Sequence, residues 1–149
     1  MHASTVLLSL LSAAGAIAAP ASNAVSAMAA VPQWTIKSYT RTCDSADTSC
    51  KVAFSVDTKV AGATVQACSF TLKKTGSTPA SQAPIDNVTC GVYKLSSGWS
   101  GQFGPNNGFT TLSVVDFSKK LIVWPSYSDS EVKNGKAVTP DKSYAPANL

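Results

Sequence analysis

The chain has 149 residues, of which 44% are hydrophobic and 13% are charged, and its 12 basic and 8 acidic residues give a net charge of +4. This length corresponds to a single domain once a leader is removed. The basic residues are scattered, with Lys73-Lys74 and Lys119-Lys120 as the adjacent pairs. Because a nucleic-acid-binding protein needs a basic stripe or patch, we expect no nucleic-acid partner.

The N-terminus has the layout of a secretory signal peptide. An apolar core runs from Val6 to Leu11, and small residues then lead to Ala18. The apolar run is too short, and too interrupted by serine and glycine, to be a transmembrane segment. We therefore expect a signal peptide over residues 1–18, a flexible arm or short propeptide over 19–32, and a single β-domain with an extended C-terminal tail over 33–149.

Residues 34–41, WTIKSYTR, alternate between apolar and polar with a period of two. Such alternation is typical of a strand with one buried face. It places Trp34 and Ile36 in the core. The residues expected on the opposite, solvent-facing side are Thr35, Lys37, Tyr39 and Arg41.

Three later segments, at 50–57, 65–72 and 87–94, repeat this alternation. Their expected inward-facing residues are Val52, Phe54, Val56, Cys68, Phe70, Leu72, Val88, Cys90 and Val92. Two further segments rich in β-branched and aromatic residues, FTTLSVVDF and KLIVWPSY, flank a turn at Ser118-Lys119. About seven strands and no amphipathic helix predict an all-β fold, either a small antiparallel β-barrel or a β-sandwich.

Four cysteines after a secretion signal are expected to form two disulfides, and three pairings are possible. The segment CDSADTSC closes Cys43 to Cys50 across a polar loop, and Cys68 and Cys90 share the inward face. We therefore expect Cys43–Cys50 and Cys68–Cys90. A metal site is disfavoured because the cysteines lack CxxC spacing and a histidine partner, and we expect no cofactor.

The stretch LSSGWSGQFGPNNGF, residues 95–109, has two interpretations. Trp99 among glycines could stack on a ligand such as a sugar. Alternatively, Asn107-Gly108 forms a two-residue type I′ turn, and the resulting hairpin places Trp99 opposite Asp116. Cross-strand aromatic pairs are ordinary sheet stabilisation, so the hairpin explains the stretch without a ligand and is preferred. Trp99 is then the ring expected to be exposed.

Histidine is absent after the predicted signal peptide, which contains His2. This excludes Ser-His-Asp and Cys-His catalysis and histidine-ligated zinc. A glycosidase needs two carboxylates flanking the scissile bond. Asp116 is the most suggestive acid, but capping of the Phe117-Ser118 turn is the preferred role. We therefore expect a protein that is not an enzyme.

Two further features concern the surface. Trp99, Trp124 and Tyr127 are candidate ligand-binding residues, because exposed aromatic rings bind carbohydrate. Asn87 begins the tripeptide Asn-Val-Thr, an N-glycosylation signal in a secreted chain.

Several segments together resemble a known group of proteins: WTIKSYTRTC, VQACSFTL, GFTTLSVVDFSKKLIVWPSY and PDKSYAPANL. They are similar to the small secreted proteins of filamentous fungi that include the hypersensitive-response-inducing elicitors. The resemblance covers most of the predicted β-domain. It implies a secreted, disulfide-bonded β-protein that plant cells sense and answer with cell death and defence, and it implies no catalytic residues.

The sequence therefore predicts a non-enzymatic extracellular effector. Its exposed loops at 44–49 and 74–87 and its C-terminal tail are expected to contact a host plant surface protein or cell-wall component. We expect a monomer. The alternatives are a carbohydrate- or small-ligand-binding module built on exposed aromatics, and a wall-associated structural protein.

Overall fold

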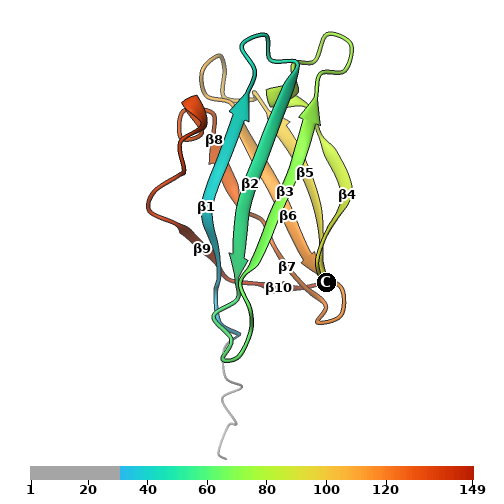
Figure 1. Ribbon diagram of the computed structural model, residues 1–149, viewed down its shortest axis with the longest axis vertical. Helices are drawn as coiled ribbons and strands as arrows, with labels where there is room; N and C mark the ends of the chain where they lie inside the picture. Colours follow the sequence, from blue (N-terminus) through green and yellow to red (C-terminus); the bar gives the residue numbers. More distant parts are fainter. Residues whose placement is uncertain (1–30) are drawn as a thin grey trace, which may run out of the picture.

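The computed structural model describes residues 31–149, which form a β-sandwich of antiparallel strands (Figure 1). The first sheet has the order β3-β2-β1-β9, and the second has the order β10-β7-β6-β5-β4 with β8 also paired to β6. The first sheet consists of β1 (Trp34–Cys43), β2 (Ser49–Asp57), β3 (Gln66–Lys73) and β9 (Lys142–Tyr144). The second consists of β4 (Ile85–Cys90), β5 (Tyr93–Ser100), β6 (Phe109–Asp116), β7 (Leu121–Val123), β8 (Ser126–Ser128) and β10 (Ala147–Asn148).

The predicted all-β fold is confirmed, with a sandwich and not a closed barrel. Two short 3-10 helices, η1 (Ala80–Gln82) and η2 (Lys133–Gly135), lie in the connections. The strands number ten instead of about seven. The difference arises partly in the C-terminal tail, where β9 and β10 pair along the edges of the two sheets.

The core lies between the two sheets and follows the period-two pattern closely in β2 and β3. Every inward-facing residue predicted for these two strands is buried. Trp34 of the first sheet meets Tyr93 of the second edge to face, with ring centroids 5.5 Å apart. Tyr39 of β1 stacks on Tyr127 of β8 with centroids 3.8 Å apart. Aromatic contacts thus join the sheets at two places along the sandwich.

Strand β1 departs from the predicted alternation at a β-bulge. Its register against β2 shifts between Lys37 and Thr40, and Ser38 has a φ of 52°. An extra residue in one strand reverses the inside–outside alternation beyond it. Tyr39 and Arg41 are therefore buried, and their predicted exposure was wrong. Thr35 was also wrong, because its hydroxyl pairs with Ser143 of the edge strand β9 and is covered there.

The β5–β6 connection also differs from the prediction. Trp99 pairs with Thr110 and Asp116 pairs with Tyr93, so the expected Trp99–Asp116 register is wrong. Asn107 and Gly108 do not form a two-residue turn but end a loop over residues 101–108. The NH of Asp129, the residue after β8, donates to the carbonyl of Gly108. Gly108 therefore pairs with the segment after β8 instead of closing the expected turn.

Val92 also departs from the prediction. It was expected in the core, but it lies in the turn between β4 and β5 with 64% of its surface exposed. The segment at 74–87, expected to be an exposed loop, contains η1, whose Ala80 is fully buried.

Both predicted disulfides are present. Cys43–Cys50 joins the paired ends of β1 and β2, and Cys68–Cys90 links β3 of the first sheet to β4 of the second. The second bond therefore ties the sheets together covalently. The predicted signal peptide and most of the predicted arm lie outside the described residues. Within residues 31–149, no helix has the length and apolar character needed to cross a membrane.

Candidate functional site

A cleft of about 1070 Å³ opens at the end of the sandwich drawn uppermost in Figure 1. Its walls come from the end of β1, the β1–β2 loop, η1, the β5–β6 loop, and the segment from β8 to η2. Its lining side chains include Arg41, Asp47, Gln82, Trp99, Asn106, Asp129, Lys133 and Asn134. Both sheets contribute, so the cleft exists only in the assembled sandwich.

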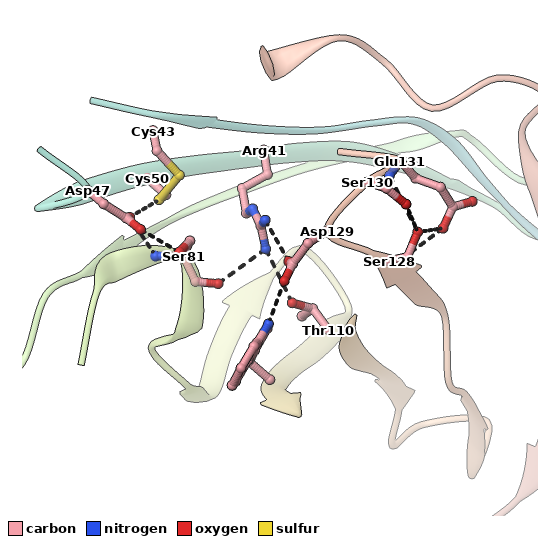
Figure 2. A network of polar contacts seen from close by, with 11 residues as sticks. Arg41, Cys43, Asp47, Cys50, Ser81, Thr110, Ser128, Asp129, Ser130 and Glu131 are labelled. Carbon is pink, nitrogen blue, oxygen red and sulfur yellow. Dashed lines mark hydrogen bonds and ion pairs between the residues drawn. A yellow bond between two sulfur atoms is a disulfide. The ribbon is translucent and has the colours of Figure 1, made fainter. Parts of the chain in front are cut away.

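Arg41 and Asp129 form an ion pair in this cleft (Figure 2). Nη2 of Arg41 lies 2.8 Å from Oδ1 of Asp129, and the side chains are 9% and 31% exposed. Nη1 of Arg41 also donates to the carbonyl of Ser81 at 3.1 Å and points to the hydroxyl of Thr110 at 3.5 Å. The guanidinium therefore joins β1 to η1 and to the second sheet, while the carboxylate keeps one side open to the cleft.

Trp99 is held by the same carboxylate. Its indole NH donates to Oδ2 of Asp129 at 2.9 Å. A Cβ atom at Gly101 would lie 2.5 Å from Cη2 of the indole, and one at Gly108 would lie 2.6 Å from Cζ2. Only glycine lets the backbone approach the ring this closely, so these glycines serve to position Trp99.

Asp47 fixes the part of the cleft wall that η1 forms. Its carboxylate accepts from the backbone NH of Ser81 at 2.8 Å and from the Ser81 hydroxyl (Figure 2). Cys43, Asp47 and Cys50 lie close enough together to suggest a metal site. The two sulfur atoms are bonded to each other, however, and cysteine coordinates a metal as a thiolate, which leaves one carboxylate as the remaining ligand. These three residues therefore have a structural role and do not form a metal centre.

The rim carries two asparagines in left-handed backbone conformation, Asn106 with φ 68° and Asn134 with φ 70°. Asparagine tolerates this conformation better than most residues, which explains its presence at these turns. Among the contacts described for residues 31–149, the side-chain amides of Gln82, Asn106 and Asn134 have no hydrogen-bond partner in the protein. Their donors and acceptors are available to a ligand.

Lys142 of β9 connects the C-terminal tail to the core. Its ammonium lies 2.6 Å from Glu131, and it also sits 4.8 Å from the ring centroid of Tyr127. Partial burial opposes ionisation of Glu131, but the hydrogen bonds from Lys142 and Ser128 outweigh it and lower the pKa of that carboxyl.

Burial raises the pKa of Tyr39 to about 12, despite the opposing charge of Arg41.

The three aromatic residues proposed as ligand-binding do not form one platform. Trp99, the ring expected to be exposed, lines the cleft and is half-buried. Tyr127 is a core residue, only 2% exposed, stacked on Tyr39. Trp124 is 52% exposed but does not line the cleft. Of the three, Trp99 alone retains a structural case for binding.

Two other candidates have clear positions. Asp116 caps the turn after β6, accepting from the Ser118 hydroxyl at 2.6 Å and the Lys119 NH at 3.1 Å, as preferred on sequence grounds. Asn87 is exposed at an irregularity of β4, and its glycosylation stays a prediction.

Sequence reasoning missed Arg41 and Asp129 as site residues. Arg41 was assigned to the solvent face because a bulge leaves little trace in the hydrophobic pattern. Asp129 lies in a short polar segment, SDSEVK, that has no recognisable motif. One sequence signal was present. Gly101 and Gly108 lie close to Trp99 in the chain, and the absence of a side chain at both positions lets the backbone approach the ring.

Comparison with known proteins gives a consistent assignment. The profile of a family described as Effector TSP1 matches residues 35–149. A protein of Hypocrea virens named Effector TSP1 is 54% identical over 145 residues, which cover 97% of this chain and 96% of that protein. The resemblance to fungal proteins of the effector type is thereby confirmed. The chain belongs to the Effector TSP1 family and is a fungal effector protein.

Proposed function

We propose that the chain is a secreted effector that plant cells recognise by surface contact and answer with hypersensitive cell death and defence responses. It acts as a rigid ligand without chemical turnover. The observation that carries this proposal is that the loops around the cleft are held in place. The Cys43–Cys50 disulfide and the Arg41–Asp129 ion pair anchor these loops.

The chemistry of the cleft supports a contact mechanism. Its acids, Asp47 and Asp129, already accept hydrogen bonds from Ser81, Arg41 and Trp99. The four cysteines are bridged, and His2 is the single histidine of the chain. Loops held on a rigid scaffold are the usual carriers of recognition. The predicted signal peptide supports delivery outside the cell.

The test is infiltration of leaves with the purified protein, secreted from a eukaryotic host so that both disulfides form. We expect necrosis and induction of defence genes at micromolar concentration, and we expect activity to survive brief heating because the cross-linked sandwich refolds. Protein that has been reduced and alkylated is the control and should be inactive. No response at micromolar concentration across a panel of plants contradicts the proposal.

A further inference from the structure

We propose that the cleft is a binding site for an uncharged oligosaccharide, with Asp129 and Trp99 as its central contacts. This inference rests on the proposed function, since an effector outside the cell meets wall glycans before it meets a membrane. Its physical basis is independent and lies in the size, charge and polar groups of the cleft.

The size of the cleft suits a chain of sugar rings. Pockets that hold drug-sized ligands have volumes of about 300–1,000 Å³. The cleft has about 1070 Å³ and is open at one end of the sandwich. It can therefore take a ligand longer than one sugar ring.

The charges of the cleft favour an uncharged ligand. Arg41 and Lys133 balance Asp47 and Asp129 among its lining residues. Arg41 is committed to Asp129, so it offers no free guanidinium for a phosphate or a uronate. Lys133 is exposed, and the interaction of one exposed lysine with an anion is too weak to select a charged ligand.

The polar groups of the cleft match hydroxyl chemistry. Each oxygen of Asp129 has one protein donor, Arg41 or Trp99, and a carboxylate oxygen can accept a second hydrogen bond. Two neighbouring hydroxyls of a sugar can donate to this fixed carboxylate. The amides of Gln82, Asn106 and Asn134 supply both donors and acceptors around it. Hydroxyl groups need this mixture, because each both donates and accepts.

Trp99 supplies the apolar part of the site. The C–H faces of sugar rings pack on aromatic surface, and Trp99 is the one aromatic side chain among the residues described as lining the cleft. A flat apolar metabolite would require several aromatic or aliphatic walls. The remaining lining is largely polar, which favours an oligosaccharide over such a metabolite.

The test is direct titration of the purified full-length secreted protein by calorimetry and tryptophan fluorescence. Cellohexaose and mannohexaose represent plant walls, chitohexaose and laminarihexaose represent fungal walls, and trigalacturonic acid is the charged comparison. We expect saturable binding of at least one neutral hexasaccharide and none of the uronate. Absence of saturable binding for all four neutral sugars overturns the proposal, and so does tighter binding of the uronate.

Variants locate the site. Asn106→Gly with Asn134→Gly removes two amides while keeping the left-handed backbone, and should weaken binding about tenfold or more. Asn87→Gly is the matched control, because Asn87 has φ 53° and lies outside the cleft, and it should bind normally. Trp99→Phe should abolish the fluorescence response and Trp124→Phe should not. Unchanged binding in the asparagine double variant, or equal loss in Asn87→Gly, overturns the assignment.

The two proposals can fail separately. A protein that binds sugar but causes no leaf response leaves the cleft assignment standing and contradicts the elicitor activity. A protein that causes necrosis but binds no sugar leaves the elicitor activity standing and contradicts the cleft assignment.

Discussion

The guanidinium of Arg41 on β1 lies 2.8 Å from the carboxylate of Asp129, which follows β8 on the opposite side of the sandwich. The two residues are 88 positions apart in the chain. The pair lies in the lining of the cleft, and the carboxylate also accepts a hydrogen bond from Trp99. The bulge at Ser38 makes this possible, because without it Arg41 would face solvent.

Breaking this pair should destabilise the protein. Arg41→Met leaves a partly buried carboxylate without its cation, and we expect a loss of about 2 kcal/mol in unfolding free energy, less than for a fully buried pair because Asp129 is 31% exposed. Urea unfolding measures it. Adding Asp129→Asn should cost less than the sum of the single changes. Strict additivity would show that the pair is not coupled.

The two disulfides should differ in their contributions. Cys43–Cys50 spans 7 positions and Cys68–Cys90 spans 22. The loop-entropy model gives about 2.5 and 3.4 kcal/mol respectively. Replacing each pair by alanine and comparing urea midpoints tests the order, and a larger loss from the Cys43–Cys50 replacement contradicts it.

Ser38 should respond to substitution as a left-handed residue. Ser38→Gly removes the steric cost of φ 52° and is expected to raise stability by up to about 1 kcal/mol. Ser38→Val adds a β-branched side chain and should lower stability by about 1–2 kcal/mol. Thermal unfolding gives both values. Thr42→Val, at an exposed position further along β1, is the control and should show no such penalty.

Glu131 should confer pH dependence. Its pKa is below the ordinary value of 4.5, so its contribution is present above pH 4.5 and is lost as the pH falls through the lowered folded-state pKa. Glu131→Gln should cost about 0.2–1 kcal/mol at pH 7, the range for solvent-exposed ion pairs. The difference from the parent protein should shrink at pH 3. A difference that grows on acidification contradicts the assignment.

The sequence alone determined the fold class and the cross-links. In β2 and β3 the strands run without interruption, so the period-two pattern predicts burial correctly. Both cysteine pairs followed from a short polar loop and a shared inward face. These are local properties, and local alternation reports which face is buried as long as the register does not shift.

Only the tertiary structure decided the site. The bulge at Ser38 reversed the second half of β1, and the pairing of Gly108 with Asp129 displaced the expected turn. Both outcomes depend on segments far along the chain, since Asp141 accepts from the NH of Ser38 at 2.8 Å. A local pattern carries no information about such partners. The strands could therefore be read from the sequence, whereas the cleft arises from contacts between segments that only folding brings together.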